Sequence, residues 1–348
     1  RQLLSWLGFF YSCTPNTKNM NELHKIAKQM MAKQKGILAA DESNGSADKR
    51  LAGIGVEGTE EMRRQYRELF IGTKGIGSYL SGIILYDETM HQKDSRGEPF
   101  LSLLQKEGVL IGIKVDEGKD PDPHSPMETL TKGLAGLKER LPKYYEMGAR
   151  FAKWRAVIKI DHQLPTHENI EHEMAHLAMY ARLCQDNGIV PMVEPEVLLA
   201  GDHSMHRAAD VVYVALKELF EELEAAEVDL KGLILKTSMV LPGKDSAAGR
   251  ATPEEVAKAT VDVLKEVVPK DVAGVVFLSG GQEPEEATEN LRAINALQPL
   301  PWPTTFSYAR AIQGPVLEMW RGNDQYVERA RKQFIIRLEA NVDAITRS

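Results

Sequence analysis

Residues 230–240 read Leu-Lys-Gly-Leu-Ile-Leu-Lys-Thr-Ser-Met-Val, a mostly apolar stretch with Lys236 near its end. A short apolar run of this kind is typical of a parallel β-strand that is buried on both faces. A lysine at the end of such a strand is costly to bury as a cation, and a neutral amine at pH 7 is a nucleophile for a carbonyl carbon. The alternative is a lysine whose ammonium group reaches solvent beyond the strand. The other strands of the chain help to distinguish a buried, nucleophilic Lys236 from one that reaches solvent.

Eight apolar runs of strand length alternate with longer amphipathic segments. The predicted strands cover residues 36–41, 79–87, 109–116, 149–157, 189–196, 230–236, 274–281 and 304–308. The predicted helices cover residues 21–34, 59–70, 127–141, 168–186, 206–226 and 285–297, a segment that follows the Thr252-Pro-Glu-Glu255 capping box, and the residues up to the C-terminus. This alternation predicts an α/β fold, a (β/α)8 TIM barrel with extra N- and C-terminal helices. An open doubly wound sheet is the alternative, but no Gly-x-Gly-x-x-Gly motif follows the first strand.

The composition of the 348 residues, with 43% apolar and 27% charged, is typical of a soluble globular protein. A formal net charge of −7 argues against nucleic acid or an anionic membrane as the main partner. Two cysteines cannot build a disulfide framework, which favours a reducing, cytoplasmic location. Residues 1–19 precede Met20 and are too short in their apolar part to span a bilayer. We therefore expect an extension of unclear role over residues 1–19 and a single barrel domain over residues 20–348.

Charged or hydroxyl-bearing residues stand at the carboxyl end of nearly every predicted strand. In a barrel these ends form the mouth at which catalytic residues lie. Lys153 and Arg155 are two residues apart, as are Glu194 and Glu196, so each pair shares one face of its strand. Surface charge alone does not readily explain this pattern, and we expect lysines and carboxylates from five strands to converge. The full set is Asp41, Asp87, Lys114, Lys153, Arg155, Glu194, Glu196, Lys236, Ser279, Ser307 and Arg310.

The ends of the last two strands have the composition of a phosphate site. Ser279-Gly280-Gly281 and Ser307-Tyr308-Ala309-Arg310 supply backbone N–H groups, glycine for close approach and an arginine fork. A plain turn is the alternative for the two glycines taken alone. Two phosphate sites beside a buried amine would predict a carbonyl substrate phosphorylated at both ends. The second anionic site is indicated after the first strand by Ser43, Ser46, Lys49 and Arg50.

Six motifs, in order along residues 35–321, resemble those of the class I fructose-bisphosphate aldolases. They are Gly36-Ile-Leu-Ala-Ala-Asp-Glu-Ser43, Gly112-Ile-Lys-Val-Asp116, Phe151-Ala-Lys-Trp-Arg155, Val190-Pro-Met-Val-Glu-Pro-Glu196, Leu235-Lys236 and Phe277-Leu-Ser-Gly-Gly-Gln282. The resemblance implies a Schiff base between Lys236 and the ketone of fructose 1,6-bisphosphate or dihydroxyacetone phosphate. It implies no metal and no cofactor, sugar phosphates as the only small-molecule partners, and a homotetramer.

The same resemblance assigns roles to individual residues. Glu194 would handle protons while the imine forms, and Lys153 and Asp41 would assist at the carbon–carbon bond, with Glu196 nearby. Ser279, Gly280 and Arg310 would bind one phosphate. The channel towards the other phosphate would be lined by Ser43, Ser46, Lys114 and Arg155. A protonated imine is an electron sink, and the neighbouring cation Lys153 would favour the neutral, nucleophilic form of Lys236.

Two features depart from the family pattern. Residue 309 is alanine where the family usually has glycine, beside the expected phosphate. The chain ends at Ser348 without the tyrosine-ending tail of many eukaryotic members, a feature that bears on proton exchange and on the preference for bisphosphate over monophosphate.

The sequence also contains features of other functions. His172-Glu-Met-Ala-His176 fits the His-Glu-x-x-His zinc motif, but both histidines fall away from the apolar stripe of their predicted helix, so we expect a solvated face. His203 and His206 are interpreted as loop residues. A transaldolase-like or deoxyribose-phosphate-type aldolase would also use a lysine, although two phosphate loops speak against it. A catalytically silent scaffold would have no need of a buried amine.

Overall fold

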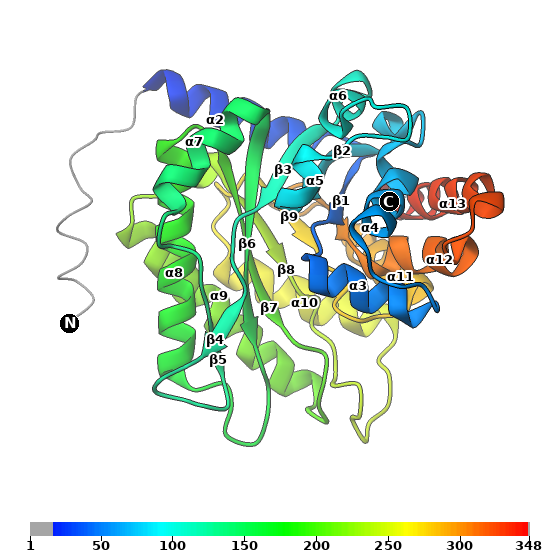
Figure 1. Cartoon of the computed structure of the whole chain (residues 1–348). Helices are drawn as coiled ribbons and strands as arrows, with labels where there is room; N and C mark the ends of the chain where they lie inside the picture. Colours follow the sequence, from blue (N-terminus) through cyan, green and yellow to red (C-terminus); the bar gives the residue numbers. More distant parts are fainter. Residues whose placement is uncertain (1–16, 347–348) are drawn as a thin grey trace.

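The computed structural model describes residues 17–346 and contains a closed barrel of eight parallel strands (Figure 1). The strands neighbour one another in chain order, and the last pairs with the first. They are β1 (Gly36–Ala40), β2 (Leu80–Leu85), β3 (Leu110–Lys114), β6 (Ala149–Ile158), β7 (Val190–Val197), β8 (Ile234–Thr237), β9 (Gly274–Phe277) and β10 (Thr304–Tyr308). The predicted (β/α)8 barrel is thereby confirmed.

Helices surround the barrel on its outside (Figure 1). They are α2 (Thr17–Met30), α3 (Asn44–Gly53), α4 (Glu60–Ile71), α5 (Asp87–His91), α6 (Phe100–Lys106), α7 (Leu137–Met147), α8 (His167–Asp186), α9 (Met205–Ala225), α10 (Pro253–Val267), α11 (Pro284–Ala296), α12 (Arg310–Trp320) and α13 (Val327–Thr346). The Thr252 capping box predicted for α10 is present, with both of its hydrogen bonds. None of the helices within residues 17–346 is long and apolar enough to cross a lipid bilayer.

The side chains of each barrel strand alternate between the lumen and the surrounding helices. Ala39, Phe151, Met192 and Ile234 belong to a buried cluster inside the barrel, whereas their chain neighbours such as Leu235 pack in the larger core under the helices. A strand residue two positions further along has the same orientation. The lumen therefore continues from these apolar side chains to the polar residues that follow them towards the carboxyl ends of the strands.

Helix α2 closes the opposite end of the barrel, where the strands begin (Figure 1). Its residues Leu23, Ile26, Ala27 and Met30 are buried against the lumen cluster. The helix begins at Thr17, four residues earlier than predicted, so part of the expected extension belongs to it. Residues 1–16 of that extension lie outside the described residues.

The helix predicted for residues 127–141 is wrong in its first half. A separate antiparallel hairpin, β4 (Lys119–Pro121) and β5 (Thr129–Thr131), occupies this region, and α7 begins only at Leu137. The segment Glu-Thr-Leu-Thr has the alternation and the β-branched threonines of a strand. Gly133 and Gly136 follow with φ of 124° and 71°, which a continuous helix does not allow.

The strand around Lys236 is shorter than its apolar run. Residues Leu230–Gly232 form a 3-10 turn, η2, in which the side chain of Asp229 accepts a hydrogen bond from the N–H of Lys231. Strand β8 then contains only four residues, with Lys236 as the third. The other strands agree with the prediction to within a few residues at their ends.

Candidate active site

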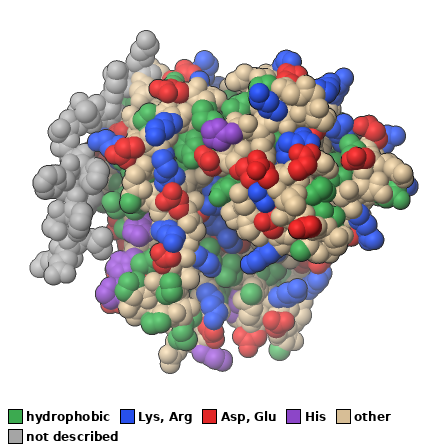
Figure 2. Space-filling view, in the orientation of Figure 1, with side chains coloured by type: hydrophobic (Ala, Val, Ile, Leu, Met, Phe, Trp, Pro, Cys, Tyr) green, Lys and Arg blue, Asp and Glu red, His purple; other side chains and the backbone are tan. Residues whose placement is uncertain are grey.

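A cavity of about 980 Å³ opens at the carboxyl ends of the barrel strands. Figure 2 shows Lys and Arg side chains gathered in the hollow of this face. All but two of the site residues predicted from the sequence line this cavity. They are Asp41, Ser43, Ser46, Arg50, Lys114, Lys153, Arg155, Glu194, Glu196, Lys236, Ser279, Gly280, Ser307, Ala309 and Arg310.

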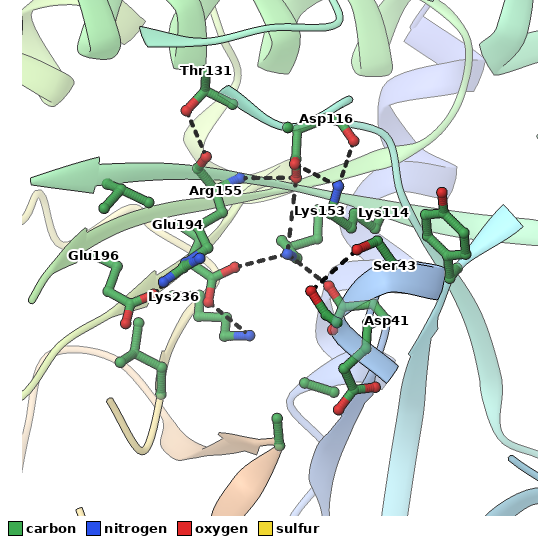
Figure 3. A pocket seen from close by; sticks show the side chains of 18 of the residues that line it. Asp41, Ser43, Lys114, Asp116, Thr131, Lys153, Arg155, Glu194, Glu196 and Lys236 are labelled. Atoms are coloured by element: carbon green, nitrogen blue, oxygen red, sulfur yellow. Dashed lines mark hydrogen bonds and ion pairs between the residues drawn. The ribbon is translucent and has the colours of Figure 1, made fainter. Parts of the chain in front are cut away.

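Lys236 is buried at the cavity wall, with 3% of its surface exposed. Its Nζ lies 2.9 Å from Oε1 of Glu194, which comes from the adjacent strand β7. The second carboxylate oxygen of Glu194 lies 3.2 Å from Nζ of Lys153 on β6. Glu194 thus lies between the two lysines, as Figure 3 shows. This arrangement follows from strand order, because β6, β7 and β8 are neighbours and each places its residue on the lumen face.

Lys153 also contacts carboxylates that follow two other strands of the barrel, β1 and β3. Its Nζ lies 2.6 Å from Oδ2 of Asp41 at the end of β1 and 3.9 Å from Oδ2 of Asp116 after β3 (Figure 3). Asp116 in turn pairs with Lys114, with 2.5 Å between Nζ and Oδ1. The buried charges therefore form one network in which each cation contacts at least one carboxylate.

The charges of this network shift the pKa values of its members and so set their protonation states. Burial alone would raise the pKa of Asp41, but Lys153 and Lys236 outweigh it and lower that pKa to about 2. Burial would likewise raise the pKa of Glu194, and the same two lysines hold it below its ordinary value. Burial would lower the pKa of Lys153, yet Asp41, Glu194 and Asp116 raise it well above its ordinary value. Both carboxylates and Lys153 are therefore charged at neutral pH.

The far end of the cavity, at β9 and β10, carries groups that lack a partner. Ser307 is buried, and its hydroxyl has no hydrogen-bond partner among the described residues. Arg155 pairs with Glu196, whereas Arg310 forms no ion pair with a described residue. Partial burial and the nearby cations Arg50 and Arg155 lower the pKa of Arg310, although Glu196 opposes this shift. An uncompensated guanidinium beside a free hydroxyl is suited to an anion.

The backbone beside Arg310 is shaped by two glycines in the left-handed region. Gly280 and Gly281 have φ of 57° and 97°. Gly281 does not line the cavity itself, but a Cβ added there would lie 3.4 Å from Nη2 of Arg310. Ala309 has φ of −106°, which any residue adopts, so alanine in place of the family glycine is not strained there.

Helix α3, which follows β1, forms a neighbouring part of the cavity wall, because β1 pairs with β10. Ser46 and Arg50 are one turn apart and line the cavity together, and the hydroxyl of Ser43 lies 3.1 Å from that of Ser46. Arg50 is held by Glu42, at 2.6 Å, and by the side chain of Gln313. Lys49, which was predicted with them, is exposed and lies outside the cavity lining.

A family model described as "Fructose-bisphosphate aldolase class-I" matches residues 22–348. The chain belongs to the class I fructose-bisphosphate aldolase family. It is accordingly an enzyme of the lyase class, and the resemblance seen in the six motifs is confirmed over nearly the whole sequence.

Individual relatives agree with this membership. The chain is 47% identical over 329 residues to the fructose-bisphosphate aldolase of Dictyostelium discoideum, covering 94% of this chain and 92% of that one. It is 48% identical over 311 residues to fructose-bisphosphate aldolase 4, cytosolic, of Arabidopsis thaliana, covering 89% and 79%. Among solved structures, an aldolase from Plasmodium falciparum in complex with TRAP and a small-molecule inhibitor superposes with a TM-score of 0.94 at 44% identity, covering 96% of each chain.

Several residues of the aldolase cavity were not among the predicted site residues. They are Glu42, Tyr86, Asp116, Glu117, Gly118, Lys119, Thr131, Arg140 and Tyr144, and Asp87 also lines the cavity. Asp116 had a signal, because it stands two residues after Lys114 at the end of a predicted strand. Lys119 and Thr131 belong to the β4–β5 hairpin, of which only β5 falls within the helix predicted for residues 127–141. The hydroxyl of Tyr144 donates a hydrogen bond of 2.9 Å to Oδ1 of Asp87. No sequence pattern predicts this contact.

The His-Glu-x-x-His segment does not lie on a solvated face of α8, as had been expected. His172 and His176 are half-buried, and Glu173 between them is fully buried under the β4–β5 hairpin. Nδ1 of His176 lies 3.2 Å from the carbonyl oxygen of Thr131. Within the described residues, no group of three or more His, Cys, Asp or Glu side chains is arranged to hold a metal ion. The hairpin, absent from the sequence prediction, explains why this face is covered.

Proposed function

We propose that this aldolase cleaves fructose 1,6-bisphosphate reversibly to dihydroxyacetone phosphate and glyceraldehyde 3-phosphate through a Schiff base on Lys236. The observation that supports it most is the 2.9 Å contact between Nζ of Lys236 and Oε1 of Glu194 at the wall of the cavity. An amine beside a carboxylate that can take up its proton is an activated nucleophile for a ketone.

The first steps need only these two residues and the substrate. Glu194 takes the proton of the Lys236 ammonium, and the free amine adds to the ketone carbon to give a carbinolamine. Glu194 then returns a proton to the carbinolamine hydroxyl, which leaves as water, and a protonated imine remains. A carboxylate that Lys153 and Lys236 hold in its charged form at rest is suited to accept the first proton.

The carbon–carbon bond breaks next. Asp41 takes the proton of the hydroxyl on the carbon that becomes the aldehyde, and the bonding electrons flow into the protonated imine to give an enamine. Lys153 lies 2.6 Å from Asp41, so its positive charge keeps Asp41 ionised and ready for that proton. Glu196, paired with Arg155 at the same wall, orients that arginine towards the substrate. Protonation and hydrolysis of the enamine then release dihydroxyacetone phosphate.

Two groups of residues in the cavity lining are suited to bind the two phosphates. The unpaired Arg310, the free hydroxyl of Ser307 and the backbone at Ser279 and Gly280 would take one phosphate, with Gly281 leaving room for the guanidinium. The second phosphate would meet a larger group of lining residues, Ser43, Ser46, Arg50, Lys114 and Arg155. Lys49 is exposed and is not part of that lining.

Three further properties follow from this proposal. The imine serves as the electrophile, so the reaction should need no metal and should survive a chelator. A cytoplasmic location is supported by the cytosolic relatives of Arabidopsis thaliana. We also propose that residues 20–348 act as one domain and that the enzyme is a homotetramer, the latter on family resemblance alone.

Reductive trapping tests the central step. The protein is incubated with dihydroxyacetone phosphate and borohydride, and the reduced adduct is mapped by peptide mass spectrometry to Lys236. Lys236→Arg should abolish the adduct and turnover, whereas Lys231→Arg, at an exposed lysine just before the same strand, should leave both unchanged. An adduct on any other lysine, or turnover lost with EDTA and restored by zinc, would contradict the proposal.

A further inference from the structure

One buried carboxyl group has no part in the reaction proposed above. Glu173 on α8 has no exposed surface and does not line the cavity. Its Oε1 lies 2.9 Å from both the backbone nitrogen and Oγ1 of Thr131, the last residue of β5. Its Oε2 has no hydrogen-bond partner within the part of the chain that the structure describes. A charged carboxylate in this position would be poorly compensated.

The residue it contacts belongs to the cavity wall. Thr131 lines the cavity, as do Gly118 and Lys119 at the other strand of the hairpin. The hairpin is a two-stranded sheet outside the barrel, so its position depends on contacts to α8 and β6. One face of α8 supplies several of them. Asn169 donates to Asp122 and to the carbonyl of Thr129, Thr166 donates to Glu128, and His176 contacts the carbonyl of Thr131.

The number of protons available at Thr131 indicates whether Glu173 is protonated or ionised. Oγ1 of Thr131 lies 2.9 Å from Oε1 of Glu173 and also 2.9 Å from the carbonyl oxygen of Arg155, a contact drawn in Figure 3. A hydroxyl has one proton, and the carbonyl can only accept. If Glu173 is ionised, one of the two contacts has no proton. If Glu173 is protonated, it donates to Thr131 and Thr131 donates to Arg155, so both contacts are hydrogen bonds.

We propose that Glu173 is a positioning residue whose protonated carboxyl holds the β4–β5 hairpin against β6 beside Arg155, and that loss of this proton weakens substrate binding. This inference rests on the proposed function, because it concerns the wall of the same cavity. Glu173 touches no reacting atom, and it acts through Thr131.

The surroundings of Glu173 favour the neutral form. Burial raises its pKa to about 8, against the two hydrogen bonds from Thr131, and the carboxylates of Asp116 after β3 and Asp122 in the hairpin raise it further. Of the histidines on its own helix, His176 has its pKa lowered by burial, and the ring of His172 lies 5.6 Å from that of His124 in the hairpin. The hairpin lysine Lys132 pairs with the exposed Asp120.

The test compares wild type with Glu173→Gln from pH 6.5 to 9.5. Glutamine keeps an uncharged acceptor for the Thr131 amide and cannot ionise, but it loses the hydrogen bond that protonated Glu173 donates to the Thr131 hydroxyl. If only the protonated form is competent, the KM of wild type for fructose 1,6-bisphosphate should rise by up to about tenfold per pH unit above pH 8, with a smaller change in kcat. The KM of Glu173→Gln should stay flat over this range and equal that of wild type to within about threefold at pH 7. Superimposable KM profiles for the two proteins would overturn the proposal.

A second readout does not depend on turnover. Hydrogen–deuterium exchange of the segment 117–132 is measured for both proteins at the same pH, so that intrinsic exchange rates cancel. We expect equal exchange at pH 7 and faster exchange in wild type at pH 9. Equal exchange at both values would contradict the inference even if the enzyme cleaved another substrate.

Absence of any cleavage of fructose 1,6-bisphosphate by folded wild type would instead contradict the proposed function. If Glu173→Gln does not fold, exchange in wild type alone, corrected for intrinsic rates, still has to increase in segment 117–132 and not in α9. Uniform behaviour of the two segments would overturn the inference.

Discussion

Oε1 of Glu194 lies 2.9 Å from Nζ of Lys236, and the two residues come from the adjacent strands β7 and β8. If this contact passes protons during imine formation, Glu194→Gln should slow turnover by roughly 10²- to 10⁴-fold, because the amide keeps the shape but cannot accept the proton. Steady-state and single-turnover kinetics measure the effect, with circular dichroism as the check on folding. Glu221→Gln, on the outside of α9, is the matched control. Unchanged turnover in Glu194→Gln would mean that Glu194 only forms ion pairs with the two lysines and transfers no proton.

Asp41 links the charge network to stability in acid. Its pKa of about 2 in the folded protein lies below the ordinary value of 3.8, so the unfolded state binds a proton first as the pH falls. The stabilisation is complete above pH 3.8 and is lost as the pH falls through about 2. It amounts to roughly 2 kcal/mol. Urea unfolding of wild type and Asp41→Asn between pH 2 and 6 should show this extra acid-sensitive part in wild type alone. Parallel curves would mean that Lys153 and Lys236 do not stabilise the carboxylate.

The unpaired Arg310 should distinguish phosphorylated from plain substrates. A charge-assisted fork to phosphate is worth about 1.5–3 kcal/mol, so Arg310→Ala should lower kcat/KM for fructose 1,6-bisphosphate about ten- to hundredfold. The reaction of an unphosphorylated ketose such as fructose should change far less. Arg310→Lys, which keeps the charge and loses the fork, should fall in between. Equal losses on both substrates would show Arg310 to be structural.

Ala309 stands where the family usually has glycine, and its φ of −106° means that glycine brings no relief of strain. Ala309→Gly should therefore be neutral or should destabilise the fold by up to about 1 kcal/mol, through the greater freedom of the unfolded chain. We expect KM for phosphorylated substrates to stay within about twofold of wild type. Thermal unfolding together with KM measures this. Tighter substrate binding in the variant would indicate that the loop adopts a positive φ at residue 309 when phosphate is bound.

The errors of the sequence prediction come mainly from the missed β4–β5 hairpin. Residues 129–131 alternate like a strand but are too few to be distinguished from the helix that follows, so the hairpin was missed and with it Lys119 and Thr131 in the cavity wall. The face of α8 that carries Glu173 also carries Asn169 and His176, and polar residues on a helix predict solvent unless a covering element is known. Asp116 was within reach of the pattern, because it repeats the spacing of the paired charges on β6 and β7.

The barrel, the strand that carries Lys236, and the shared lumen face of Lys153 with Arg155 and of Glu194 with Glu196 can all be predicted from the sequence alone. These features depend on local periodicity and on the alternation of side chains along a strand, which are properties of short segments. Three relationships could be seen only in the folded barrel: Glu194 lies between Lys236 and Lys153, Arg310 has no ion pair within residues 17–346 where Arg155 has one, and Glu173 is covered by a hairpin. Those relationships depend on the closure and register of the barrel, which bring together residues as far apart in the chain as Asp41 and Lys153, and on the burial that results.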